Sequence, residues 1–400
     1  MGDLQTSETI KPNKIKWFYI YRIFTLNHFF TAIYVVYLRS LGFSFLTIAS
    51  LHLAKDISSA VLELPLSYLS DRIGHKKVMV LPGIATILML TIITLKPTTV
   101  MLHLAFVLWG VAVAADSGVS DAYLYSAVGG EKFPVVQSNT YSARQVFAAF
   151  FKLIGSIAYG ISNLLPFLLS GVNSLVSSFS SLFLVNEHSV FKKKKGFFSF
   201  SAIRQTLKSR EFLTIISHNT ILVALLGISF TYESVLLVDR GLQVELLGVV
   251  GLVKALSNSI GSAISKKFTL TKKINLLYFG FYWATSLGIF LLAIARSYSL
   301  SLFALVLISI INGIMMPYKT VLLNHVIVED RATLLSVQAQ LSLILRSSGA
   351  LLIGWIADNR STEQALFVLA LALFVSIIVI NVLSKGQINE LVNENENLTT

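Results

Sequence analysis

The sequence predicts an all-α integral membrane protein with twelve transmembrane helices, and three observations support this. Of its 400 residues, 54% are hydrophobic and only 13% are charged, which excludes a water-soluble domain of this size. Twelve stretches approach the roughly 20 apolar residues that a helix needs to cross a bilayer core about 30 Å thick. Lys and Arg gather in alternate connecting segments. The twelve stretches use most of the chain, so no folded extramembrane domain is expected.

The predicted helices follow one another with short polar gaps. In chain order they begin near Trp17, Phe45, Val78, Thr99, Ser138, Leu164, Phe212, Glu245, Ile274, Ser299, Leu334 and Thr362. The first stretch is too long for a signal peptide and lacks a small-residue cleavage site. It therefore predicts a retained helix.

The distribution of basic residues predicts the topology. Segments expected inside hold 20 Lys and Arg, and the outer loops hold five. This is the positive-inside bias, which predicts a multi-pass membrane protein with both termini in the cytoplasm. It also argues against a nucleic-acid partner, despite a net charge of +12. The run Lys192 to Lys195 is expected to anchor near anionic lipid. Since the chain has no Cys, disulfides and thiol catalysis are excluded.

The chain is expected to divide once, at a basic segment that contains an amphipathic piece, Phe200 to Leu213, on the inner surface. The predicted parts are an N-terminal cytoplasmic segment (1–16), an N-terminal six-helix half (17–185), a cytoplasmic linker (186–211), a C-terminal six-helix half (212–384) and a cytoplasmic tail (385–400). An internal repeat supports the division. Four residues recur at an offset of 194 positions, namely Ser142, Lys152, Gly155 and Gly160 as Ser336, Arg346, Gly349 and Gly354.

One motif lies in the gap between the second and third predicted helices. Ser67 to Lys77 reads Ser-Tyr-Leu-Ser-Asp-Arg-Ile-Gly-His-Lys-Lys. It resembles the loop between helices two and three of the major facilitator superfamily, although Ser67 replaces a usual Gly and His75 a usual Arg. The alternative is an ordinary basic cytoplasmic loop. The resemblance implies two parallel six-helix halves with a substrate site between them. It also implies a conformational-switch role for the matching residues Asp71, Arg72, Gly74, Lys76 and Lys77.

Two further stretches are similar to bacterial exporters of that superfamily. Ser117 to Tyr125 is similar to the end of their fourth helix, where the family's final Asp is Ser126 here. In the family that acid commonly pairs with the Arg that is His75 here. Gly155 to Gly160 keeps the outer glycines of the fifth-helix signature of drug-proton antiporters. These resemblances favour an exporter-like branch and imply a location in the bacterial cell (inner or plasma) membrane.

Charged side chains inside helices should face the protein interior, because each costs roughly 2.5 to 3.5 kcal/mol at a helix centre. In the second helix, polar residues from His52 to Ser67 recur every three or four positions and share one face. Asp56 is the principal proton-coupling candidate because it is central, and Glu63 and Asp116 are further candidates. The alternative is that Asp56 forms a structural pair with a basic residue of helix five or eleven.

By resemblance, helices one, four, seven and ten line the central cavity. The substrate-cavity candidates are Asn27, His28, Tyr34, Ser117, Asp121, His218, Asn219 and Glu233. His28 can instead be a packing residue, and Glu233 can be exposed at the cavity mouth. The deep basic residues, expected to form gates or charge pairs, are Arg144, Lys152, Lys254 and Arg346. Arg22, near a helix end, is expected to snorkel to the interface.

The predicted function is proton-coupled secondary transport by alternating access, most simply export of a small amphipathic drug or toxic metabolite. The alternatives are a proton-coupled nutrient importer and a non-transporting membrane sensor or assembly factor. An enzyme is not expected, because no nucleotide-binding Gly loop or metal-spaced His cluster is present. No cofactor or metal is predicted. The expected partners are a small-molecule substrate, protons and the lipid bilayer, and the protein is expected to be a monomer.

Overall fold

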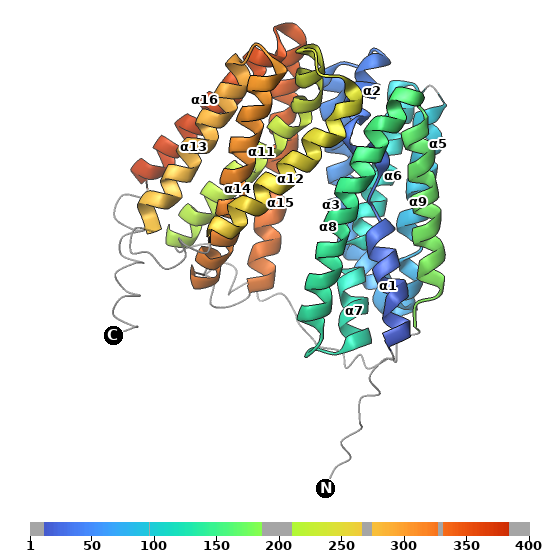
Figure 1. The fold of residues 1–400 in the computed structure, drawn as a ribbon. Helices are drawn as coiled ribbons and strands as arrows, with labels where there is room; N and C mark the ends of the chain where they lie inside the picture. Colours follow the sequence, from blue (N-terminus) through green and yellow to red (C-terminus); the bar gives the residue numbers. More distant parts are fainter. Residues whose placement is uncertain (1–11, 96, 186–209, 266–273, 327–330, 384–400) are drawn as a thin grey trace, which may run out of the picture. The chain divides into compact units, whose positions relative to one another are not determined.

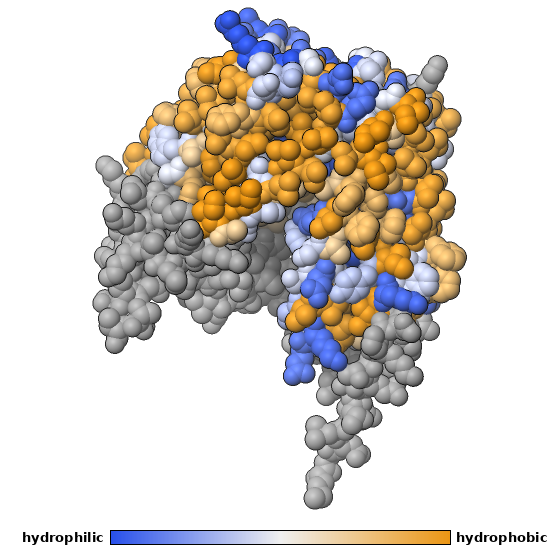
Figure 2. All heavy atoms as spheres, in the orientation of Figure 1, coloured by the Kyte–Doolittle hydropathy of each residue, from blue (hydrophilic) through white to orange (hydrophobic). Residues whose placement is uncertain are grey.

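The computed structural model describes residues 12–95, 97–185, 210–265, 274–326 and 331–383 (Figure 1). Every regular element in these ranges is a helix. Nine helical stretches in the described part of the chain are long and apolar enough to cross a membrane. Large apolar side chains such as Val100 and Leu64 are exposed on their surfaces, and Figure 2 shows a largely hydrophobic face. This is the surface that contact with lipid requires. Most of the predicted linker, 186–209, lies outside the described residues.

The first span is broken, although the sequence predicts one continuous helix. It consists of α1 (Pro12–Phe24), η1 (Phe29–Ala32) and α2 (Tyr34–Ser40). Two side chains of α9 (Leu165–Leu182) satisfy the interrupted backbone: Ser170 Oγ accepts from Phe29 N (2.9 Å), and Asn173 Nδ2 donates to Asn27 O (2.9 Å). Backbone groups freed inside a membrane need such partners, since lipid offers none.

Two glycines with positive φ redirect the backbone, one just before the third span and one within the fourth. Gly74 (φ 97°) precedes α4 (His75–Val78), and α5 (Leu81–Thr94) follows. Gly118 (φ 71°) separates α6 (Thr99–Asp116) from α7 (Val119–Val128). Glycine adopts this region without the steric penalty that a Cβ brings. The second and fifth spans are single helices, α3 (Phe45–Ile73) and α8 (Phe133–Ile161).

The later spans begin near the predicted positions. They are α11 (Arg210–Asp239), η2 (Val244–Leu246) with α12 (Leu247–Ser265), α13 (Ile274–Ile294), α14 (Tyr298–Val326), α15 (Arg331–Asn359) and α16 (Thr362–Leu383). Small residues let α12 and α14 approach closely. A Cβ added at Gly261 would lie 2.1 Å from Ile310 O, and one at Gly313 would lie 2.0 Å from Asn258 O. Such contacts are typical of helix packing in membranes.

By packing, the chain forms two compact units, residues 1–33 with 54–195 and residues 34–53 with 196–400. In the first unit, α1 packs against α8 and α9, and η1 lies between these helices. In the second unit, α2 packs against α11, and the Asp358 carboxylate accepts hydrogen bonds from the N–H groups of Phe45 and Leu46, both 2.8 Å. The sequence-based division assigns residues 34–53 to the N-terminal half. By packing, this segment groups with the second unit.

Candidate functional site

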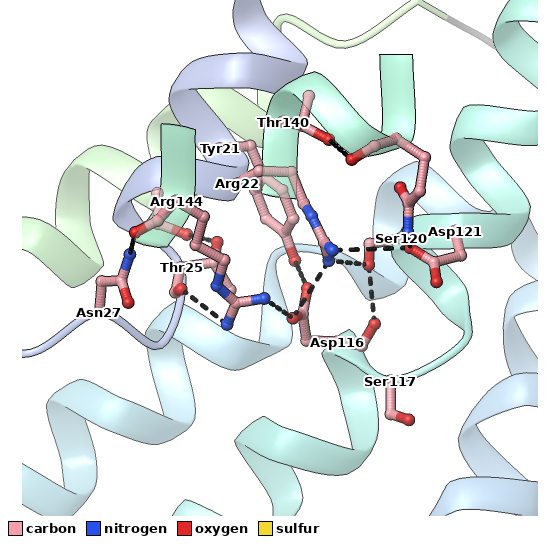
Figure 3. A network of polar contacts seen from close by, with 12 residues as sticks. Tyr21, Arg22, Thr25, Asn27, Asp116, Ser117, Ser120, Asp121, Thr140 and Arg144 are labelled. Carbon is pink, nitrogen blue, oxygen red and sulfur yellow. Dashed lines mark hydrogen bonds and ion pairs between the residues drawn. The ribbon is translucent and has the colours of Figure 1, made fainter. Parts of the chain in front are cut away.

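A buried carboxylate lies where α1, α6 and α8 of the first unit meet (Figure 3). Asp116 accepts a hydrogen bond from Tyr21 Oη (3.1 Å). Its other oxygen lies 3.6 Å from a guanidinium nitrogen of Arg22 and 3.6 Å from one of Arg144. Asp116 and Arg22 are only 5% and 6% exposed. A buried charge is tolerated when it is paired and hydrogen-bonded in this way.

The glycine break between α6 and α7 explains how these groups come together. Asp116 is the last residue of α6, and α7 begins three residues later, after the break at Gly118. Arg22 Nη1 donates to Ser120 Oγ (2.6 Å), and Arg22 Nη2 lies 3.6 Å from Asp121. Gln137 of α8 donates to Asp121 as well (2.8 Å). The break therefore presents two acids and a hydroxyl to α1 and α8.

A cavity of about 260 Å³ lies beside this network, between the end of α1, η1 and α8. It is lined by Leu26, Asn27, His28, Thr31, Tyr141, Arg144, Gln145, Ala148 and Lys152. Of these nine described residues, two are cations and none is an acid. The cavity lining is therefore polar and includes two basic side chains, although it lies within membrane-spanning segments.

Arg144 connects the cavity to the buried acid. One guanidinium nitrogen faces Asp116, and Nη2 donates to Thr25 O (3.3 Å). The side chain is still 21% exposed, so part of it remains available to a ligand. Arg144 is the residue through which the two regions contact each other.

The two candidates at the end of α1 have different surroundings. Asn27 Nδ2 donates to Ile23 O (2.7 Å) and Arg144 O (3.1 Å), so it holds the chain break in place. The His28 ring stacks on Phe30 with centroids 4.9 Å apart. Neither ring nitrogen of His28 has a hydrogen-bond partner among the residues that the structure describes.

The predicted proton-coupling residues of α3 lie in the same unit. Asp56 is 3% exposed, and Lys55 Nζ lies 3.1 Å from it. Lys55 is the neighbouring residue in the chain, and a pair between Asp56 and a basic residue of helix five or eleven stays a prediction. Glu63 accepts a hydrogen bond from Ser117 Oγ (2.9 Å), at the α6–α7 break.

The second unit holds the remaining cavity and charge-pair candidates. Lys254 Nζ lies 2.5 Å from both carboxylate oxygens of Glu233, and each side chain is 17% exposed, so Glu233 is not at an open mouth within this unit. Tyr34 Oη lies 2.8 Å from His52 Nε2, and Tyr282 Oη donates to Asn219 Oδ1 (3.4 Å). The aliphatic part of the Arg346 side chain packs against Gly227. The His218 side chain lies outside the described residues.

Several contacts join residues within the motif loop, and α4 also packs against α7 and α9. His75 is fully buried and makes a 2.9 Å contact with Ser70 Oγ. Asp71 is exposed, and its carboxylate lies 4.0 Å from His75 Nε2. The Arg72 guanidinium lies over the Tyr68 ring at 4.6 Å. Lys76 and Lys77 follow in α4.

Sequence reasoning missed two members of the network, Tyr21 and Arg22. The expectation that Arg22 reaches the membrane interface is wrong, because its guanidinium is buried against Asp116. A signal was present: Phe18, Tyr21, Arg22 and Thr25 recur at helical spacing and therefore share one face. An arginine on such a face points to a buried partner.

Comparison with known proteins agrees with this architecture. The family model described as Major Facilitator Superfamily matches residues 18–341. The chain belongs to the major facilitator superfamily. It is therefore a multi-pass membrane transporter of small molecules and not an enzyme.

Solved structures share the fold of this superfamily member at low sequence identity. A point mutant of the nucleoside transporter NupG is similar with a TM-score of 0.77 and 12% identity, over 93% of this chain and 99% of that one. A bacterial homologue of the human lysosomal transporter Spinster, in an inward-facing and unoccupied conformation, gives 0.76 and 14%, over 94% and 98%. No curated protein matches the sequence. At these identities the likeness concerns the fold alone.

Proposed function

We propose that this protein is a proton-coupled secondary transporter that moves a small amphipathic solute together with a proton, by alternating access in the bacterial cell membrane. The contact between Arg144 and both Asp116 and the cavity carries the proposal. Ionisable residues inside membrane spans mark substrate and ion pathways, because their insertion is otherwise costly.

The geometry favours binding of solute and proton together. A solute that accepts hydrogen bonds from Arg144 competes with Asp116 for the same guanidinium. Once Arg144 turns to the solute, Asp116 keeps Arg22 and Tyr21 and becomes the group that takes up a proton. The protein with bound solute then also carries the proton, and simultaneous binding of the two is the condition for symport. An inward proton gradient would drive import by such a cycle.

Export in exchange for protons is the second candidate, and the sequence favours it. The break at Ser117 to Tyr125 and the Gly155 to Gly160 segment both resemble bacterial exporters. In that cycle the proton and the solute would occupy the site in turn, and coupling could lie with Asp56 or Glu63 on α3. The two candidates therefore differ in the direction in which protons move relative to solute.

Purified protein in liposomes loaded with a pH-sensitive dye separates the candidates. The probes are octanesulfonate, uridine and ethidium, added outside at equal pH. Symport predicts that the lumen becomes acidic when a transported probe enters, whereas antiport predicts that it becomes alkaline. These signs hold for either orientation of the protein. Uptake of a radiolabelled probe without any pH change would contradict proton coupling, and the absence of uptake of all three probes would contradict the proposed solute class.

A further inference from the structure

Both basic side chains that line the cavity between α1, η1 and α8 already have partners within the protein. Arg144 lies 3.6 Å from the Asp116 carboxylate and donates to Thr25 O (3.3 Å). Lys152 likewise interacts with another part of the chain. None of the described residues that line the cavity is an acid. The lining therefore offers no spare cation to an anionic solute and no carboxylate to a cationic one.

This balance of charge favours an uncharged solute. A charged solute would bring its charge into a membrane-spanning region without a partner, or it would have to break the pair between Arg144 and Asp116. Both are unfavourable, because a buried charge needs a partner of opposite sign. An uncharged solute enters the cavity without either penalty.

Uncharged polar side chains of α8 line the same cavity. Gln145 Nε2 donates to Tyr141 Oη (3.0 Å), across one turn of the helix. The Tyr141 side chain is 55% exposed. With this contact made, the Tyr141 hydroxyl can still donate and the Gln145 carbonyl can still accept. Such a pair matches a solute group that both accepts and donates hydrogen bonds, as a primary amide does.

The wall at the end of α1 gives a second, independent indication of a ligand. His28 lines the cavity, is 3% exposed, and has no hydrogen-bond partner for either ring nitrogen among the described residues. Buried polar groups without partners are uncommon in native proteins and call for a ligand or a water molecule. A neutral imidazole also carries one donor and one acceptor, so His28 presents the same combination as the α8 pair.

We propose that the transported solute is an uncharged molecule with a short apolar body and one polar group that both donates and accepts hydrogen bonds. The inference rests on the proposed transport function and names its substrate class. Tyr141 and Gln145 bind the polar group, and His28 gains a hydrogen-bond partner from the solute. A carbonyl oxygen in this group also accepts from Arg144, as the proposed coupling requires. The cavity volume of about 260 Å³ lies below the ordinary range for drug-sized ligands, so the solute is small.

Binding can be tested without transport, using the full chain in lipid nanodiscs at neutral pH. The probes are hexanamide, hexanoate and hexylammonium, which share a chain length and differ in charge. N,N-dimethylhexanamide is a fourth probe that keeps the acceptor and lacks the donors. The readout is the thermal unfolding midpoint as a function of probe concentration. We expect hexanamide to raise the midpoint more than each of the other three probes.

Four variants locate the site. Tyr141→Phe and Gln145→Met each remove one hydrogen-bonding group and should weaken hexanamide binding about threefold to tenfold. His28→Phe should also weaken binding, and it should raise the midpoint of the ligand-free protein because it removes buried polar atoms that lack partners. Tyr298→Phe is the matched control, since this exposed tyrosine begins α14 and does not line the cavity. It should bind hexanamide like the wild type.

The outcomes separate this inference from the proposed function. No response to hexanamide, or an equal response to any of the other three probes, would overturn the assignment, as would unchanged hexanamide binding in both Tyr141→Phe and Gln145→Met. If octanesulfonate or ethidium is transported with protons while hexanamide does not bind, the transport function stands and the substrate class falls. If hexanamide binds through Tyr141 and Gln145 but no probe moves with protons, the class of ligand stands and the function falls.

Discussion

Gly155→Ala is expected to disrupt the contact between α8 and the broken first span. A Cβ built at Gly155 would lie 1.8 Å from the backbone oxygen of Phe29, whereas ordinary contact begins at 3.4 Å. The shortfall of 1.6 Å cannot be relieved by a rotamer change, because the obstructing atom belongs to the backbone of η1. Overpacking of this kind costs about 1 to 3 kcal/mol. That corresponds to about a fivefold to 150-fold change in the unfolding equilibrium.

The same shift should damage transport, because Phe29 follows His28, which lines the cavity. The assay is thermal unfolding in nanodiscs together with proton movement in liposomes. Gly171→Ala in α9 is the matched control: its Cβ would lie 4.0 Å from the nearest heavy atom, Leu90 Cδ1. It should be neutral or stabilising, since Ala favours a helix by about 1 kcal/mol over Gly. Equal stability and activity of the two variants would refute the close contact.

Three other substitutions test contacts elsewhere. Lys254→Gln should lower the free energy of unfolding by about 3 to 5 kcal/mol, because it leaves the Glu233 charge unpaired. Adding Glu233→Gln should restore most of this loss. If the double variant is no more stable than Lys254→Gln in thermal unfolding, the pair is not stabilising. Asp358→Ala should lower the free energy of unfolding by about 0.5 to 2 kcal/mol, because it removes the acceptor for the first N–H groups of α3. An unchanged thermal unfolding midpoint would count against this capping contact. Asp71→Asn should slow solute transport and leave solute binding within a few fold, since the motif loop lies away from the cavity; loss of binding in a folded protein would contradict a switch role.

The span pattern could be predicted from the sequence because it depends on hydropathy and length. The breaks could not, since a hydropathy window does not register backbone direction. The interruption after α1 is stabilised by Ser170 and Asn173, which lie more than 140 positions further along the chain. Gly118 gave a local signal for the second break, but glycine also occurs inside unbroken helices of this chain, such as Gly155 in α8.

The candidate site was predictable in composition but not in pairing. Insertion cost identifies Asp116, Arg144 and Lys152 as buried charges that need partners. It does not say which helix faces which, so the shared contact of Asp116 with two arginines was not foreseen. For Asp56, a neighbour in the chain supplies a cation, and spacing on one helix gave no reason to expect this. The roles of Asp56 and Glu63 in proton coupling stay predictions.

The most direct test of the account compares Asp116→Asn with Asp56→Asn in liposomes loaded with a pH-sensitive dye, with a probe that the wild-type protein transports. If Asp116 and Arg144 link solute binding to proton uptake, wild-type protein should acidify the lumen as the probe enters. Asp116→Asn should bind the probe but move no protons with it, while Asp56→Asn keeps its coupling. Retained proton movement in Asp116→Asn, with loss in Asp56→Asn, would contradict the account and assign coupling to α3.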